Sequence, residues 1–133
     1  MKKAILVSLT LLLGACNSTE NVSEPYFTQA PIQVEQTEVK KYWVFQPQKA
    51  KKFHGKRPSW MPDKPGMMTY KLVIDSNGNE VTKELISTTP NNWMTQQQLT
   101  DMPKMTYEPS DKNTNRVPVE VVMQLALGIT RNK

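Results

Sequence analysis

Two stretches of the chain alternate between apolar and polar residues, which is the period of a strand with one buried face. The first covers residues 68–75 and the second, longer one covers residues 117–127. Asn77 and Gly78 follow the first stretch, and this pair is typical of a tight hairpin turn, so a returning strand is expected over residues 80–88. The pattern predicts a small antiparallel sheet of about three strands.

One short helix is expected between the second and third strands. It would run over residues 93–102, with Asn91 or Asn92 as its N-cap and Pro103 as its end. Residues 42–45 are a further apolar stretch, too short to assign as strand or helical turn. The fold class is therefore α+β, a sheet packed on one or two short helices, and the predicted core consists of Leu72, Ile74, Leu85, Leu99, Val119, Val121, Met123 and Leu125.

The N-terminus carries a different pattern. Lys2 and Lys3 precede an apolar run of about ten residues, too short to span a membrane and typical of a signal peptide over residues 1–15. The run ends in Leu13-Gly14-Ala15-Cys16, which resembles the lipobox of bacterial lipoproteins. That resemblance implies that Cys16 becomes the mature N-terminus and carries diacylglycerol and an N-acyl chain, a stable anchor when two or more chains insert. Asn17, which is not Asp, resembles the outer-membrane class of such lipoproteins.

Residues 17–41 are rich in Ser, Thr, Asn, Glu, Gln and Pro and have no sustained period. This composition favours a flexible tether. The predicted organisation is a signal peptide over residues 1–15, a lipidated N-terminus and tether over residues 16–41, and a periplasmic domain over residues 42–133.

Composition limits the chemistry. The 133 residues allow one domain, and the formal net charge is +5, with 17 Lys and Arg against 12 Asp and Glu. A single Cys and a single His, Cys16 and His54, cannot form an internal disulfide or supply the ligands of a zinc site. We therefore expect no enzyme, no metal, no cofactor beyond the lipid and no nucleic-acid partner. The basic residues between 49 and 57 are interpreted as a solvated segment, or as a contact with anionic lipid or an envelope polyanion.

The order of strand, Asn-Gly turn, strand, short helix and last strand resembles the C-terminal domain of TonB over residues 66–128. The residues that carry the resemblance are Val73-Ile74-Asp75, Gly78, Val81, Ser87-Thr88, Leu99, Tyr107-Glu108-Pro109 and Val117-Pro118-Val119. Trp60-Met61-Pro62 stands where that family has a Tyr-Pro element. The resemblance implies a domain that pairs its last strand with a short segment of another envelope protein.

The last strand is thus the expected partner-binding site. Pro118 lacks an N–H and is tolerated at a strand start or on a border strand, and Glu120 is the one charge that would discourage pairing. The predicted partner-binding border consists of Val119, Val121, Met123 and Leu125. Two alternatives are that this border forms a homodimer and that residues 42–45 cover it. The expected function is an outer-membrane adaptor facing the periplasm, or alternatively a structural or pilot-type accessory lipoprotein of a secretion, pilus or flagellar machine.

Overall fold

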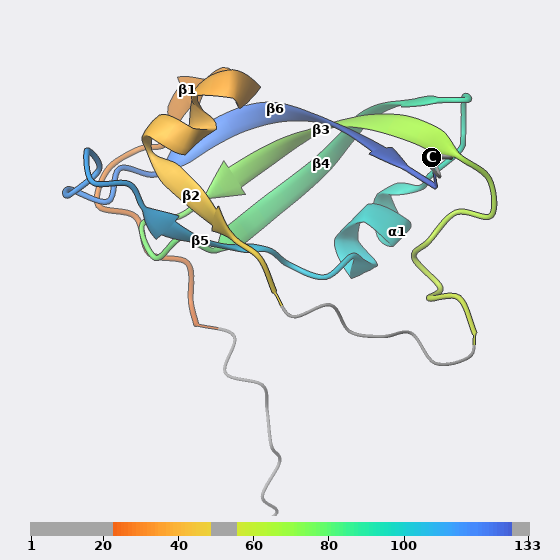
Figure 1. The fold of residues 1–133 in the computed structure, drawn as a ribbon, viewed down its shortest axis with the longest axis horizontal. Coiled ribbons are helices and arrows are strands. Elements are labelled where there is room, and N and C mark those ends of the chain that lie inside the picture. Colours follow the sequence, from red (N-terminus) through yellow and green to blue (C-terminus); the bar gives the residue numbers. More distant parts are fainter. Residues whose placement is uncertain (1–22, 49–55, 129–133) are drawn as a thin grey trace, which may run out of the picture.

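The computed structural model describes residues 23–48 and 56–128, and its elements are mostly strands (Figure 1). Strands β1, β6, β3 and β4 form one sheet in that order, and β2 and β5 form a separate two-stranded ribbon. β1 runs parallel to β6, whereas the other pairs are antiparallel. In chain order the elements are β1 (Ile32–Val34), η1 (Gln36–Lys41), β2 (Trp43–Gln46), β3 (Gly66–Ile74), β4 (Glu80–Thr89), α1 (Gln96–Asp101), β5 (Thr106–Pro109) and β6 (Val119–Leu127).

The predicted sheet of about three antiparallel strands is therefore right in part. Its three strands are present as β3, β4 and β6, with β3 in the middle. The sheet is nevertheless mixed and four-stranded, because residues 32–34 add β1 beside β6. The two helices are η1 and α1, and each has only six residues. No helix in the two described ranges is long and apolar enough to cross a membrane.

The β3–β4 hairpin confirms the Asn-Gly signal. Asp75 follows β3, and its Oδ1 accepts the N–H groups of Asn77 and Asn79, both at 2.9 Å, which closes the turn. Gly78 has φ +80°, and a Cβ built there would lie 2.0 Å from the carbonyl oxygen of Tyr107. Glycine is required at this position by the backbone angle and by the close approach of β5.

The predicted core is confirmed. Leu72, Ile74, Leu99, Val119 and Val121 are buried, and three further predicted residues are partly buried against them, namely Leu85, Met123 and Leu125. The ribbon joins this core through Trp43, which is 1% exposed and whose Nε1 donates to the carbonyl of Val117 at 2.9 Å. One core therefore holds both the sheet and the ribbon together.

The helix begins later than predicted. α1 starts at Gln96, and Thr95 is its N-cap, with a capping box in which Gln98 reciprocates the Thr95 bond. Asn92, one of the two predicted caps, instead lies at φ +57° in the turn before the helix. The capping box satisfies two free amides at once, so it outcompetes a lone asparagine.

The prediction that the tether extends to residue 41 is wrong, because the second half of that segment is folded against the rest of the domain. The N–H of Tyr26 donates to Asp75 Oδ2 at 3.1 Å, and the carbonyl of Tyr26 accepts the N–H of Ser76 at 2.8 Å. β1 and η1 follow, and Val39 of η1 is buried. Ile32 and Val34 of β1 pack against the core on either side of the exposed Gln33, but three residues are too few to show a strand period in the sequence. The domain therefore begins well before residue 42.

Candidate functional site: the strand borders

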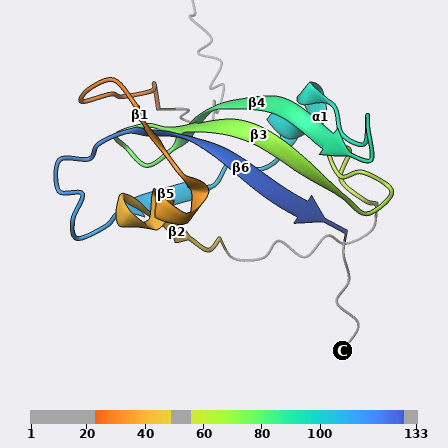
Figure 2. The ribbon, with the colours of Figure 1, turned by 90° about the horizontal axis from the view of Figure 1, so that it is seen from above.

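The border of β6, the predicted partner site, is occupied by the chain's own N-terminal segment. Figure 2 shows β1 beside the first half of β6, where Ile32, Gln33 and Val34 pair with Val119, Glu120 and Val121. The N–H of Ile32 also donates to the carbonyl of Pro118 at 3.1 Å. β6 is thus an inner strand over this half, which corrects the prediction of an open border.

The four predicted border side chains face the core instead. Val119 and Val121 are buried in it, and Met123 and Leu125 are partly buried against it. They belong to the inward face of β6, whose opposite face exposes Val122. The prediction located the strand and its apolar face, but the strand order depends on residues 32–34, which sequence patterning left in the tether.

The second half of the β6 border is filled by a side chain. The Oε1 of Gln36 accepts the N–H of Gln124 at 2.9 Å, and its Nε2 donates to the carbonyl of Gln124 at 3.3 Å. A carboxamide in this position reproduces the two hydrogen bonds of a neighbouring strand. Outward-facing backbone groups recur at every second residue of a strand. Beyond Gln124, Ala126 is therefore the only residue of β6 whose backbone N–H and C=O face this border.

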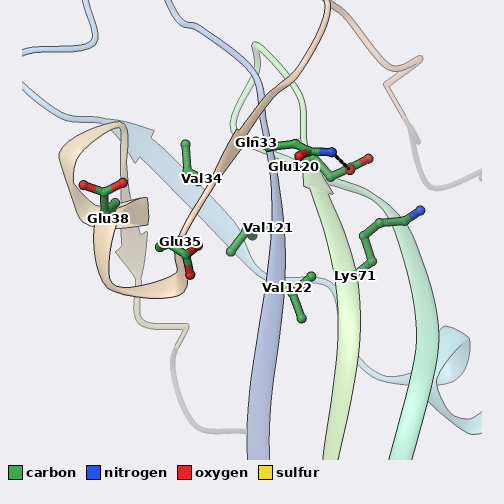
Figure 3. A pocket seen from close by; sticks show the side chains of 8 residues that line it. All are labelled: Gln33, Val34, Glu35, Glu38, Lys71, Glu120, Val121 and Val122. Atoms are coloured by element: carbon green, nitrogen blue, oxygen red, sulfur yellow. Dashed lines mark hydrogen bonds between the residues drawn. The ribbon is translucent and has the colours of Figure 1, made fainter.

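A shallow concavity lies over the β1–β6 junction (Figure 3). The amide of Gln33 donates to Glu120 Oε1 at 3.3 Å across the two strands, which supports their pairing. Lys71 at the rim forms an ion pair with Glu84 at 2.9 Å, and this contact raises the pKa of the Lys71 ammonium. The residues that line the concavity are Gln33, Val34, Glu35, Glu38, Lys71, Glu120, Val121 and Val122.

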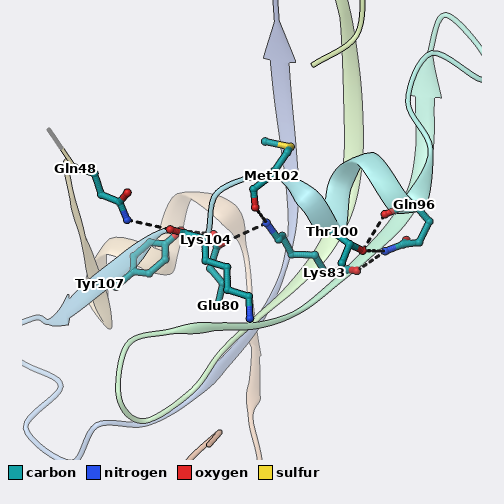
Figure 4. A network of polar contacts seen from close by, with 8 residues as sticks. All are labelled: Gln48, Glu80, Lys83, Gln96, Thr100, Met102, Lys104 and Tyr107. Atoms are coloured by element: carbon teal, nitrogen blue, oxygen red, sulfur yellow. Dashed lines mark hydrogen bonds and ion pairs between the residues drawn. The ribbon is translucent and has the colours of Figure 1, made fainter. Parts of the chain in front are cut away.

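The border of β4 is filled by a second glutamine, supplied by α1. The Oε1 of Gln96 accepts the N–H of Leu85 at 2.7 Å, and its Nε2 donates to the carbonyl of Lys83 at 2.8 Å (Figure 4). The Nζ of Lys83 in turn donates to the carbonyl of Met102 at the end of α1, at 3.2 Å. The outward backbone of β4 is therefore occupied at its middle, where an added strand would have to pair.

A buried polar cluster ties the ribbon to the sheet beside this border. The Lys83 ammonium lies 3.5 Å from Glu80, and Glu80 accepts the hydroxyl of Tyr107 at 3.4 Å (Figure 4). Burial, followed by the charge of Glu80, raises the pKa of Tyr70 to about 12. The same two causes raise the pKa of Tyr107 above its ordinary range. Both phenols therefore stay neutral at physiological pH.

The border of β2 is different because part of its outward backbone is open. The N–H of Ser110 donates to the carbonyl of Tyr42 at 2.9 Å, so alternate residues 42, 44 and 46 face β5. The N–H and C=O groups of Trp43 and Phe45 consequently point away from β5, but Trp43 is buried, so only the outward groups of Phe45 lie at an accessible border. Within residues 23–48 and 56–128, nothing outside the ribbon hydrogen-bonds to the backbone of these two residues. This open border is called the β2 border below.

Two apolar side chains stand on the β2 border. Val44 is 44% exposed and Phe45 is 45% exposed, although Trp43 in the same strand is buried. The ring of Phe45 packs edge-on against Tyr107 with centroids 5.9 Å apart. On the far side of the ribbon β5 is not free, since the N–H of Tyr107 donates to the carbonyl of Gly78 at 2.8 Å.

The sequence pattern leaves residues 42–45 unassigned, with cover of β6 as one alternative, and the structure instead pairs them with β5. The sequence signal closest to this ribbon is the Tyr-Glu-Pro segment at residues 107–109, which forms most of β5.

Cys16, residues 1–15 and His54 lie outside the described residues, as does most of the basic segment over residues 49–57. In the part that is described, no three His, Cys, Asp or Glu side chains are close enough to hold a metal ion. Comparison with known proteins found no matching family model, no similar curated protein and no similar solved structure. The resemblance to the C-terminal domain of TonB stays a prediction.

Proposed function

We propose that the protein is an outer-membrane lipoprotein, anchored through Cys16 on the periplasmic face, which recruits an envelope protein by strand pairing at the β2 border. The observation that carries the proposal is a contrast among the described residues: the chain itself occupies most of the β6 border and the middle of the β4 border, whereas the β2 border is open at Phe45. Proteins usually block strand borders that are not used for pairing. A border left open with two exposed apolar side chains suits recognition of an extended peptide.

The geometry of the β2 border defines how a peptide would bind. The outward N–H and C=O of Phe45 supply the main-chain hydrogen bonds, because those of Trp43 are buried with the residue. Pro47 ends the strand because it has no N–H. The Phe45 and Tyr107 rings would contact side chains on one face of the added strand, and Val44 would contact those on the other. The border is only four residues long, so we expect modest affinity, increased by confinement of both partners at the membrane.

A proline substitution tests the border. Phe45→Pro removes the outward N–H and should abolish capture of envelope proteins from detergent extracts, while Phe45→Leu, which keeps the N–H, should retain most of it. Ala126→Pro is the matched control, since it places proline at an outward position of the β6 border. Captured receptor-like barrels would favour the adaptor, and captured components of a secretion, pilus or flagellar machine would favour an accessory role. Equal capture by a folded Phe45→Pro variant would remove the β2 border from the proposal.

The anchor has a separate test. Cys16→Ser should leave an uncleaved or differently cleaved precursor and move the protein out of the outer-membrane fraction. The measurement is the intact mass of the mature protein together with membrane fractionation. A wild-type mature mass without lipid, with unchanged fractionation of the variant, would contradict the lipoprotein assignment.

A further inference from the structure

The first described residues are fixed to the hairpin turn by an unusually complete set of backbone bonds. Asp75 is 1% exposed, and its carboxylate accepts three N–H groups, those of Tyr26, Asn77 and Asn79. The hydroxyl of Ser76, which is fully buried, accepts the N–H of Thr28 at 2.9 Å. Residues 26–28 are therefore as firmly placed as the hairpin itself.

The side chains carried by this fixed segment nevertheless face outward. Tyr26 is 55% exposed and Phe27 is 43% exposed, so two adjacent aromatic rings stand at one end of the molecule. Arg116 lies beside the residue that follows them, Thr28, because the Arg116 carbonyl accepts the Thr28 hydroxyl at 3.3 Å, and Arg116 is exposed. Figures 1 and 2 both place this end of the sheet opposite α1.

The position of this end relative to the anchor is set by chain length. Tyr26 follows Cys16 by ten positions, a distance of at most about 35 Å when fully extended and roughly 17 Å on average for a flexible chain. The tether expected from sequence was more than twice as long. The docking of Tyr26 on Asp75 therefore keeps the hairpin end close to the bilayer.

We infer that this end, with Tyr26, Phe27 and Arg116, is a membrane-contacting surface that rests on the inner leaflet of the outer membrane. The inference rests on the proposed anchor at Cys16. The Tyr26 side chain has a polar tip, and such side chains are favoured at the boundary between headgroups and acyl chains, while the Phe27 ring offers apolar area to the acyl chains. An arginine beside them suits the headgroup phosphates. The lipid chains and the aromatic pair then form two attachments, which fix the orientation of the domain.

Site-directed spin labelling tests this surface on the full mature lipoprotein. Cys16 is the only cysteine in the chain, and its sulfur would be blocked by the lipid, so an introduced cysteine is the only thiol to label. Asn77→Cys places the label on the exposed hairpin turn, and Gln97→Cys places the matched control on α1. The protein is inserted into vesicles of phosphatidylethanolamine and phosphatidylglycerol, and collisions of each label with oxygen and with a water-soluble nickel chelate are measured.

The expected result is a several-fold lower nickel accessibility at residue 77 than at residue 97. Tyr26→Ser combined with Phe27→Ser should restore accessibility at residue 77, and circular dichroism should show an intact fold, because Tyr26 is docked through its backbone. Equal accessibility at both sites, or protection that survives the double variant, would overturn the inference. Protection that appears only when lipid-free envelope protein is added would also overturn it, in favour of a protein contact.

The outcome is separable from that of the proposed function. Phe45→Pro should lose partner capture and keep the protection at residue 77. A mature protein without acyl chains would overturn the anchor and the membrane surface together. Protection at residue 77 without any capture at the β2 border would overturn the strand-pairing function alone.

Discussion

β6 and β2 both expose an apolar side chain on their outer face, Val122 on one and Val44 on the other, and they differ in what lies beside them. β6 is flanked by β1 and by the Gln36 carboxamide, which reaches Gln124 across 88 residues of chain. Among residues 23–48 and 56–128, β2 pairs only with β5, on one side. The difference teaches that an open border cannot be recognised from a strand's own residues, because its neighbours come from distant parts of the sequence.

The largest expected difference between the four-stranded sheet and the two-stranded ribbon is in packing energy. Leu72, at the centre of the sheet, is fully buried, so Leu72→Ala should lower the free energy of unfolding by about 2 to 5 kcal/mol. Val44→Ala on the exposed ribbon should change it by less than about 0.5 kcal/mol. Urea unfolding of both variants measures this contrast. A comparable loss in the two variants would mean that Val44 is not a free surface residue.

Alkaline pH probes the buried polar cluster where the ribbon meets the sheet. The pKa of Tyr70 is raised from its ordinary 10.0 to about 12 by burial and by Glu80. The stability that this provides is present below pH 10 and is lost as the pH rises through about 12, a loss of about 2 to 3 kcal/mol. Tyr70→Phe should flatten the decline of unfolding free energy over that interval. Superimposable pH profiles of the variant and the wild type would show that Tyr70 ionises freely.

The smallest effect concerns the closed border itself. Gln36→Ala removes both hydrogen bonds to Gln124 and should cost about 1 kcal/mol. Amide exchange at Gln124 should accelerate, and self-association should increase, because a length of the β6 border becomes free. Gln97→Ala is the control, since that amide bonds only to Asp101. An unchanged exchange rate at Gln124 would show that Gln36 does not close the border in solution.

Local signals explain what could be predicted from the sequence. The β3–β4 hairpin follows from strict alternation and from Asn77-Gly78, and the core residues follow from the same period-two pattern. The helix is predicted from the Asn pair before it and from Pro103 after it, but it starts later than these signals indicate. Asn91 and Asn92 carry a cap signal, whereas the capping box at Thr95 and Gln98 sets the observed start.

Non-local pairing explains what could not be predicted. β1 and η1 come from a segment that is mostly polar, and the few apolar residues they add to the core, Ile32, Val34 and Val39, are too widely spaced to show a period. The observed candidate site therefore differs from the predicted one. β1 closes the β6 border that the sequence predicted to be open, and the border of β2 that remains open is the one opposite β5. The order of the strands in the sheet could not be predicted, because no local sequence pattern encodes it.

The parallel pairing of β1 with β6 also constrains the order in which the domain can assemble. β1 is the first strand of the described chain and β6 is the last, so residues 32–34 have no border to join until residues 119–121 arrive. The β3–β4 hairpin can form from residues close in sequence, but the other side of β3 stays unpaired until β6 is present. Contacts this distant in sequence are slow to form. A chain delivered to the envelope from its N-terminus would therefore remain open until its last strand emerges.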